Sequence, residues 1–259
     1  MKIYKYLPTH QGGKNVLREG SIKVLSEGTI KFSSRVEFND PFDCVANIDY
    51  TQSAKNFMDT DIYTQQAMAN RAVSRNKGKK LLEKAKKKLT SKFEQDTFSK
   101  LIDNFGVCCF SLSEDNILMW SHYASEHRGF VVEFTVEPNK FEGEKSIVEN
   151  LIGEPVTYSK DMPTITNIMS PDRDTVEPMF FTKSIDWKYE QEYRVVTMEH
   201  GIHKFDQSLI SRVILGVNIE KKDEELIRKE VRGINERLGA KIVVIKAQQL
   251  KKSYKLRTE

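Results

Sequence analysis

The chain has 259 residues, of which 39% are hydrophobic and 30% are charged, and its formal net charge is +4. This length and composition are typical of a globular protein that buries its own core, and they exclude disordered and collagen-like chains. No apolar run approaches the roughly 20 residues that cross a bilayer, and no apolar leader follows Met1, so we expect a cytoplasmic protein with no membrane partner. The length predicts a single domain over residues 1–259.

Cysteine and histidine usage gives no sign of a metal site. Cys44, Cys108 and Cys109 are an odd number without Cys-x-x-Cys spacing, and the five histidines are dispersed. We interpret the cysteines as buried free thiols of a reducing compartment. No phosphate-binding loop or Gly-x-Gly-x-x-Gly motif is present either, so the common nucleotide-binding motifs give no assignment.

Hydrophobic patterning predicts an α+β fold with mixed or antiparallel sheets. Alternating or short apolar runs bounded by turn residues predict strands at 2–6, 28–33, 107–112, 129–134, 155–158, 192–197, 212–216 and 241–246. A short helix is expected at 115–127 with Asp115 as its N-cap, and an amphipathic helix at 222–238 that Gly239 ends. Residues 51–105 lack proline and are predicted to form a helical insert, with Gly78 as a helix boundary.

The basic residues are concentrated within this insert. Nine basic residues and one acid lie between Arg75 and Lys92, which gives this segment a charge of +8 and leaves −4 for the rest of the chain. Such a segment suits the phosphate backbone of RNA or DNA, and the candidate nucleic-acid-binding residues are Lys84, Lys86, Lys87 and Lys88. The alternative is a solvated helix face.

The loop at residues 37–42 contains a candidate pair of polar residues. Pro41 keeps Asp40 out of the helical region, so Asn39 and Asp40 are expected to present polar groups at a fixed angle. We include both among the candidate cofactor-binding residues. The alternative is ordinary turn chemistry.

The segment at residues 119–127 is the densest concentration of functional side-chain types. On a helix, Tyr123 and His127 share a face, and Trp120 lies three residues before Tyr123. Such a surface could hold a planar ring by stacking, while an imidazole such as His122 supplies a hydrogen bond or a proton. The alternative is that Trp120 and Tyr123 are core aromatics.

The segment at residues 186–194 carries two carboxylates. Glu190 and Glu192 flank one residue, so an extended chain would point both to the same side, together with Arg194. Two close carboxylates repel, and one of them then keeps its proton or recruits a cation. The alternative is a structural Glu–Arg network that fixes the strand.

Several ordered motifs together resemble a known bacterial family. The motifs are Tyr4–Tyr6, Phe32–Ser34 before Phe38–Phe42, Cys109–Ser111, Met119–Tyr123 with Gly129–Phe130, Trp187–Arg194 and Val213–Gly216. In this order, from residue 3 to about residue 245, they resemble the family called domain of unknown function 2971, while the insert at 51–105 has no recognisable counterpart. The resemblance implies little about activity beyond a place in variable defence-type gene neighbourhoods.

A second resemblance is to ADP-ribosyltransferase folds. It rests on the polar residue between aromatics in the first strand, the strand that ends in serines, and the late strand with Glu-x-Glu. The resemblance implies that Lys5 or Tyr6, with Ser33 on the serine-ended strand, would contact NAD. It also implies stacking of Tyr123 or Trp120 on nicotinamide, and catalysis by Glu192 or Glu190. Lys5 stands where those enzymes generally carry Arg or His.

The sequence therefore supports three functional hypotheses. The leading hypothesis is an NAD-dependent ADP-ribosyltransferase-like enzyme, a defence toxin acting on nucleic acid, with a neutralising antitoxin as a partner. Its catalytic candidates are Glu192, Glu190, His122 and Arg194. The alternative is a non-catalytic nucleic-acid-binding or sensor module of a defence system. The third is a nuclease that holds Mg²⁺ through Asp40, Glu190 and Glu192.

Overall fold

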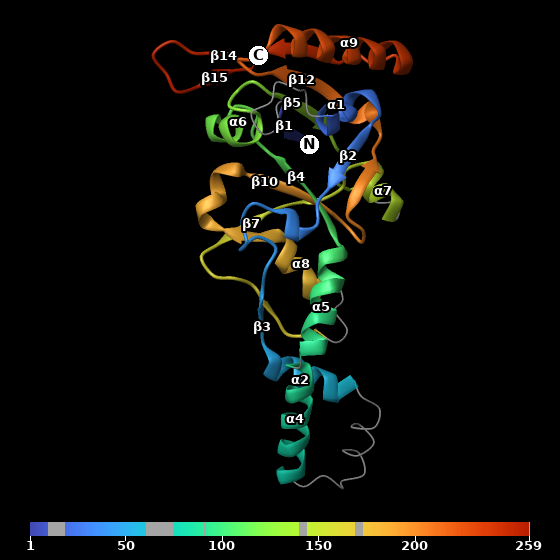
Figure 1. Ribbon diagram of the computed structural model, residues 1–259, viewed down its shortest axis with the longest axis vertical. Helices are drawn as coiled ribbons and strands as arrows, with labels where there is room; N and C mark the ends of the chain where they lie inside the picture. The colour runs from blue at the N-terminus through green and yellow to red at the C-terminus, as the bar shows by residue number, and fades with distance from the viewer. Residues whose placement is uncertain (10–18, 61–74, 91, 140–143, 169–172, 259) are drawn as a thin grey trace. The chain divides into compact units, whose positions relative to one another are not determined.

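The computed structural model describes residues 1–9, 19–60, 75–90, 92–139, 144–168 and 173–258 (Figure 1). The chain divides into two compact units, each assembled from separate segments. Unit 1 contains Met1–Ser33, Gly106–Val156 and Asp186–Glu259, and unit 2 contains Ser34–Phe105 and Thr157–Ile185. The single-domain organisation expected from the length stays a prediction.

Unit 1 is built around a seven-stranded sheet. The strand order is β13-β12-β5-β1-β4-β10-β6, and every neighbouring pair is antiparallel except β12 and β13, which are parallel. The strands are β1 (Lys2–Leu7), β4 (Gly106–Ser111), β5 (Phe130–Thr135), β6 (Glu154–Pro155), β10 (Glu192–Thr197), β12 (Ile210–Leu215) and β13 (Val243–Lys246). Two separate antiparallel pairs complete the strands of this unit: β2 (Thr29–Phe32) with β11 (Gly201–Lys204), and the hairpin of β14 (Gln248–Gln249) with β15 (Leu256–Arg257).

The helices of unit 1 are α1 (Glu19–Ser26), α6 (Ile117–Tyr123), α7 (Glu144–Glu149), α9 (Lys221–Leu238), and the 3₁₀ turns η2 (Ile185–Glu190, which begins in unit 2) and η3 (Gln207–Leu209). Helix α9 places Ile227, Val231 and Ile234 on one buried face at helical spacing. Gly239 ends it in the left-handed conformation at φ 63°, as the sequence predicts.

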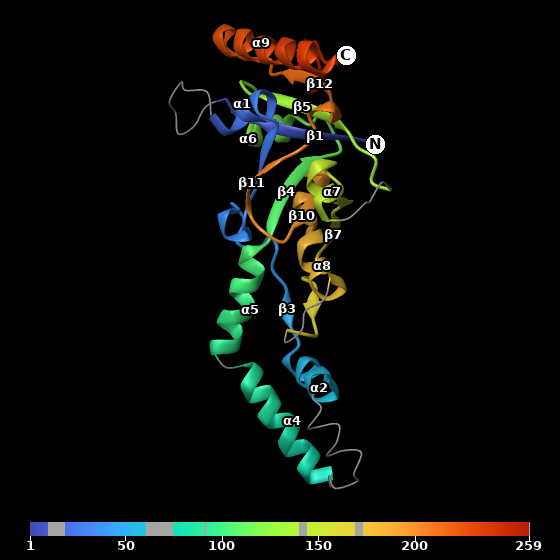
Figure 2. The same ribbon diagram turned by 90° about the vertical axis from the view of Figure 1, so that its right-hand side faces the viewer.

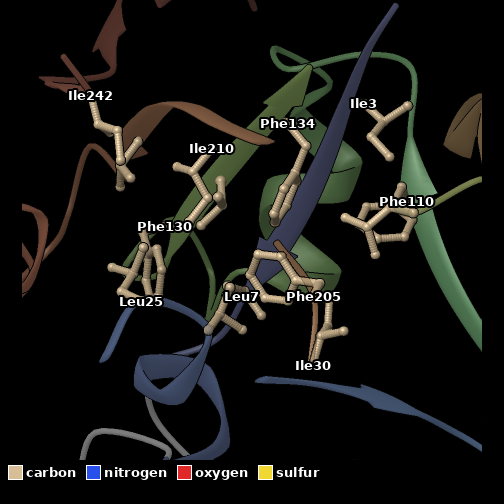
Figure 3. Packing of buried hydrophobic residues seen from close by; sticks show 14 of the residues in the cluster. Ile3, Leu7, Leu25, Ile30, Phe110, Phe130, Phe134, Phe205, Ile210 and Ile242 are labelled. Atoms are coloured by element: carbon tan, nitrogen blue, oxygen red, sulfur yellow. The ribbon is translucent and has the colours of Figure 1, made fainter. Parts of the chain in front are cut away.

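The main core lies on one face of this sheet. Strand β5 is central and buried on both sides, so its residues are apolar almost throughout. Phe130 and Phe134 point to the main core with Phe110 of β4, and Phe205 and Ile210 pack against them (Figure 3). Helices α1 and α9 contribute to the same cluster, whereas α6 covers the opposite face together with Tyr4 and Tyr6.

Unit 2 combines helices with short strand pairs. It contains η1 (Arg35–Glu37), α2 (Tyr50–Thr60), α4 (Arg75–Leu89), α5 (Lys92–Asn104), α8 (Arg173–Phe181), and the parallel pairs β3 (Asn47–Ile48) with β8 (Thr164–Ile165) and β7 (Thr157–Ser159) with β9 (Thr182–Ser184). Helices α2 and α4 lie side by side in both views (Figures 1 and 2). A buried ion pair between Lys183 and Asp43, 3.2 Å long, fixes β9 to the loop before β3.

The predicted α+β class, the mixed sheet and the helical, lysine-rich insert are confirmed; residues 61–74 and 91 of the insert lie outside the described residues. Two local predictions are wrong. Gly78 lies inside α4, since the flanking residues favour the helix strongly enough to carry one glycine. The strand expected at 155–158 is divided between β6 and β7, because the chain bonds to β10 as far as Val156 whereas Thr157–Ser159 pair with β9.

Candidate functional site

The structure brings the two segments at 119–127 and 186–194 together on one face of the unit 1 sheet. The Tyr123 hydroxyl donates to Glu190 Oε1 at 2.5 Å, and Asn116 Nδ2 donates to the Tyr189 carbonyl at 2.6 Å. Tyr189 OH and His122 Nδ1 are 3.3 Å apart. Helix α6 and the η2–β10 segment are therefore joined by side-chain contacts at three points.

Helix α6 differs from its prediction at both ends. Asn116, not Asp115, is the N-cap, and its side chain accepts hydrogen bonds from the amides of Leu118 at 2.9 Å and Met119 at 3.3 Å. The helix ends at Tyr123, because Ser125, Glu126 and His127 all take positive φ values. The expected helical pairing of Tyr123 with His127 is therefore not formed.

Trp120 is a core residue in this structure. Its side chain is fully buried, and its Nε1 donates to the Glu114 carbonyl at 2.8 Å. Tyr6 packs edge-on against it at 5.5 Å between ring centroids, and His127 stacks on it at 6.2 Å. Protein rings occupy its surroundings, so Trp120 has no free face for a ligand ring.

Glu190 lies outside strand β10. Gln191 has φ 46°, so the chain kinks between η2 and β10 and the two glutamates are not alternate residues of one extended strand. Glu190 is 1% exposed, and its carbonyl accepts a hydrogen bond from the Ser111 hydroxyl at 2.7 Å. The predicted arrangement of Glu190 and Glu192 as alternate residues of one extended chain is therefore not formed.

Glu192 is paired with Arg194. Both belong to β10, both are buried, and the Arg194 Nε donates to Glu192 Oε2 at 2.6 Å. Gly153 lets its own chain segment approach this strand, because a Cβ there would lie 1.9 Å from the Arg194 carbonyl oxygen. A buried carboxylate requires such a partner, so this pair has the geometry of a structural ion pair.

Half-exposed aromatic side chains accompany Glu190 in η2. Tyr189 lies 6.1 Å from the exposed His122 and 6.0 Å from Trp187, measured between ring centroids. We call Tyr123, Glu190, His122, Tyr189 and Trp187 the Glu190 cluster. Sequence reasoning did not select Trp187 or Tyr189, although both lie in the segment quoted for the family resemblance.

A row of polar residues crosses the same sheet face. The strand register aligns neighbouring residues of β10, β4, β1, β5 and β12, whose side chains therefore share one face: Glu192, Ser111, Tyr4, Glu133 and Arg212. Of this row, the sequence predicts only Glu192 as a site residue. The other four residues become its neighbours through the order of the strands in the sheet, which the sequence pattern does not give.

The far end of this row is a dense network that we call the Glu133 cluster. Glu133 accepts hydrogen bonds from Ser211 at 2.7 Å and from Arg212 Nε at 3.0 Å, and Lys2 lies 3.1 Å away. Arg212 also contacts Glu114 and donates to the Thr258 carbonyl at 2.8 Å. The members of the cluster are Lys2, Tyr4, Glu114, Glu133, Ser211, Arg212 and Thr258.

Burial and the neighbouring groups of the Glu133 cluster shift the pKa values of its members. Burial alone would raise the pKa of Glu133, but hydrogen bonds from Ser211, Arg212 and Lys2 outweigh burial and hold it below its ordinary value of 4.5. Burial and the neighbouring Glu114 raise the pKa of the Tyr4 phenol above its ordinary value. The cluster is therefore a network of an ionised carboxylate, a guanidinium and a neutral phenol.

The residues expected to contact NAD from the first strands are separated. Lys5 lies on the opposite sheet face, where its Nζ donates to the Cys109 carbonyl at 2.8 Å and lies 3.5 Å from Cys108 Sγ. Tyr6 faces α6 and donates to the Ser113 carbonyl at 2.9 Å. Ser33 forms a backbone bridge with Val107. The alternation of β1 thus prevents Lys5 from joining Tyr6 at one site.

The remaining candidates lie in unit 2. Asp40 Oδ1 accepts a hydrogen bond from the Phe42 amide at 2.9 Å, which is turn chemistry, and Asn39 beside it is exposed. On α4, Lys84, Lys87 and Lys88 are exposed and Lys86 is half-buried. The Mg²⁺ hypothesis thus draws Asp40 from unit 2 and its two glutamates from unit 1.

Three negative observations concern the described residues only. Their His, Cys, Asp and Glu side chains form no group of three or more that could hold a metal ion. Within the described ranges, no helix has the length and apolarity needed to span a membrane. The three cysteines are free, with Cys44 and Cys108 buried and Cys109 half-buried.

Comparisons with known proteins give one match. Neither the curated proteins nor the solved structures contain a match to this chain. The model of a family described as "Protein of unknown function (DUF2971)" matches residues 119–195. That segment contains most of α6, all of β5 and the first residues of β10, so it supplies both halves of the Glu190 cluster. The predicted resemblance to this family is therefore confirmed over residues 119–195.

Proposed function

We propose that unit 1 is an NAD-consuming, ADP-ribosyltransferase-like enzyme whose working surface is the Glu190 cluster. The observation that carries the proposal is the 2.5 Å hydrogen bond from the half-exposed Tyr123 to the buried Glu190, bordered by the aromatic rings of Tyr189 and Trp187. A planar nicotinamide ring fits a half-exposed aromatic surface of this kind, since aromatic rings stack with offset geometry.

Tyr123 is the group that would touch the substrate. Its hydroxyl donates to Glu190, and a phenol oxygen is also an acceptor that can receive a hydrogen bond from a ribose hydroxyl. The buried carboxylate strengthens that acceptor and supplies negative charge as the bond between C1′ and the nicotinamide nitrogen breaks. Glu190 acts through Tyr123 and is therefore a positioning residue.

The contacts of the two glutamates favour Glu190 over Glu192 as the residue that takes part in the reaction. Arg194 neutralises Glu192 at 2.6 Å, and both side chains are buried. Removing either partner would leave the other buried without its counter-charge, which costs stability. Glu192 and Arg194 are therefore assigned to holding β10 in place beneath the site.

The test is nicotinamide release from NAD in the presence of candidate RNA, DNA or protein acceptors. Tyr123→Phe removes the hydroxyl and Glu190→Gln removes the charge, and each is expected to lower release about 100-fold while NAD still binds. Glu236→Gln is a matched control for the glutamate variant, because Glu236 is exposed elsewhere on unit 1. Absence of both NAD binding and nicotinamide release, in wild-type protein shown to be folded, would contradict the proposal.

A second candidate function, binding of nucleic acid by α4, is supported by the exposed lysines of unit 2. Lys84, Lys87 and Lys88 are three and four residues apart, so they share one helix face. Replacing these and Lys86 with glutamine is expected to weaken RNA or DNA binding and flatten its salt dependence. Replacing Lys204, Lys221, Lys229 and Lys241 of unit 1 removes the same charge and should leave that binding unchanged.

A further inference from the structure

The carboxy-terminal hairpin of unit 1 is an ordered structure. Strands β14 and β15 pair Gln248 with Arg257 and Gln249 with Leu256, and the Leu250 amide donates to the Lys255 carbonyl at 3.0 Å. The hairpin is the red loop at the C-terminal end of the chain in Figure 1. It is not a frayed basic tail, so the backbone that carries its tip residues has a defined conformation.

Both strands of the hairpin are anchored in unit 1. Ala247 and Leu256 are 2% and 8% exposed and belong to the apolar cluster of α6, against which Tyr123 and Tyr189 also pack. Thr258 Oγ1 donates to Glu114 Oε1 at 2.5 Å, which ties the chain to the Glu133 cluster. The base of the hairpin therefore packs on the same sheet face that carries the Glu190 cluster.

The tip combines an exposed aromatic ring with positive charge. Tyr254 is 91% exposed, the highest value among the exposed large hydrophobic side chains of the described residues, and Lys251, Lys252 and Lys255 beside it are exposed as well. No acidic residue occurs between Lys241 and Thr258. Among the described residues, no hydrogen bond or ion pair engages these three lysine side chains.

We infer that this hairpin tip binds single-stranded nucleic acid, with Tyr254 stacking on an unpaired base and the lysines contacting the adjoining phosphates. An exposed aromatic ring between basic side chains is the arrangement by which single strands are held without sequence preference. In a duplex the base faces are already stacked, so the ring would have no partner there. One ring among lysines offers little apolar area to a bilayer, which argues against a lipid surface.

The inference goes beyond the proposed activity and stands without it, because binding can be measured in the absence of NAD. It also differs from the α4 candidate, since the hairpin belongs to unit 1 and α4 to unit 2. Where both proposals hold, the strand held by Tyr254 lies on the unit that carries the Glu190 cluster and is available as the ADP-ribose acceptor.

The experiment measures binding of the full-length protein to a fluorescent single-stranded oligouridine, a duplex of the same length and vesicles of anionic lipid. Tyr254→Ala is expected to weaken oligouridine binding by about 5-fold or more, the equivalent of losing one base–aromatic stack. Tyr254→Trp should restore it. The exposure of Tyr254 means that neither variant disturbs the fold.

The lysine variants separate a local site from net charge. Replacing Lys251, Lys252 and Lys255 with glutamine should lower the dependence of affinity on salt, by about 0.7 in the log–log slope for each phosphate that a lysine no longer neutralises. The control replaces Lys221, Lys229 and Lys241, which are exposed on the same unit. Equal weakening by the two triple variants, unchanged binding by Tyr254→Ala, duplex binding as tight as single-strand binding, or binding to vesicles alone would each overturn the inference.

Discussion

The Glu133 cluster and the Glu190 cluster lie on one sheet face, but their networks of contacts terminate on different groups. In the Glu133 cluster, each charged group of the interior meets an opposite charge or a hydrogen-bond donor, and the network finishes on the backbone of Thr258. In the Glu190 cluster, the carboxylate reaches a phenol that is itself half-exposed. The comparison teaches that the two buried carboxylates differ in the groups that meet them, since cations and a hydroxyl contact Glu133 and the phenol of Tyr123 contacts Glu190.

Arg212 gives the largest expected effect and tests the structural half of this comparison. Arg212→Leu would leave Glu133 buried without its guanidinium, and we expect the free energy of unfolding to fall by about 3–5 kcal/mol. Urea titration followed by circular dichroism measures it. Arg128→Leu is the control, because its ion pair with Glu126 is exposed and should contribute no more than about 1 kcal/mol. Equal losses from the two variants would contradict the role assigned to the Glu133 cluster.

Glu190→Gln tests the functional half. We expect nicotinamide release to fall about 100-fold, the effect of removing one preorganised charge or donor from a reacting centre. Stability should change by only about 1 kcal/mol, because a glutamine can still accept the Tyr123 hydrogen bond. Rate and unfolding midpoint are measured on the same preparation. If Glu190→Gln lowers the stability but leaves the rate of nicotinamide release unchanged, Glu190 stabilises the fold and does not take part in the reaction.

The pH dependence of stability distinguishes the clusters without an activity assay. The pKa of Glu133 is held below 4.5 in the folded protein, so its ionised form contributes stability that is present above about pH 4.5 and lost as the pH falls through the folded pKa. Glu133→Gln should be less stable at neutral pH and should lose less on acidification. Parallel stability curves for wild type and variant below pH 4.5 would show that Glu133 is not linked to acid unfolding.

Gln191 gives the smallest expected effect and tests the kink that separates Glu190 from β10. Gln191→Val places a β-branched residue at φ 46° and should cost about 1–2 kcal/mol. Gln191→Gly removes that conformational penalty but adds unfolded-state entropy, so a net change near zero is expected. Gln249→Val on the exposed β14 is the control. Equal stability of the two valine variants would indicate that the kink relaxes at no cost.

Much of the fold could be predicted from the sequence, because local patterning decides the strands. The alternation in β1 and the apolar runs of β4, β5 and β10 are sufficient, and Gly239 marks the end of α9 through its left-handed conformation. The early end of α6 was not predictable in this way. It depends on three successive residues with positive φ. None of them is glycine, so the residue types do not indicate that the helix ends there.

The candidate site could be predicted only in part, for a reason that the strand order explains. Glu190 and Tyr123 lie in segments with a dense local pattern, so they were selected. Glu133 and Arg212 are single polar residues in otherwise apolar strands, and their partnership exists only because β5 and β12 are neighbours. Lys5 is the opposite case. The resemblance predicts it as a site residue, but the alternation of side chains along β1 places Lys5 on the other sheet face.

The polar row across the sheet has a consequence for how the protein reaches its native state. Its members come from five strands that span the chain from Tyr4 to Arg212, so the row closes only after pairings of long sequence separation have formed. Such pairings form slowly, because the entropy of closing long loops precedes any gain from them. A chain emerging from the ribosome can close the row only once Arg212 has been made. Any chemistry that depends on the row therefore stays inactive until synthesis has passed that strand.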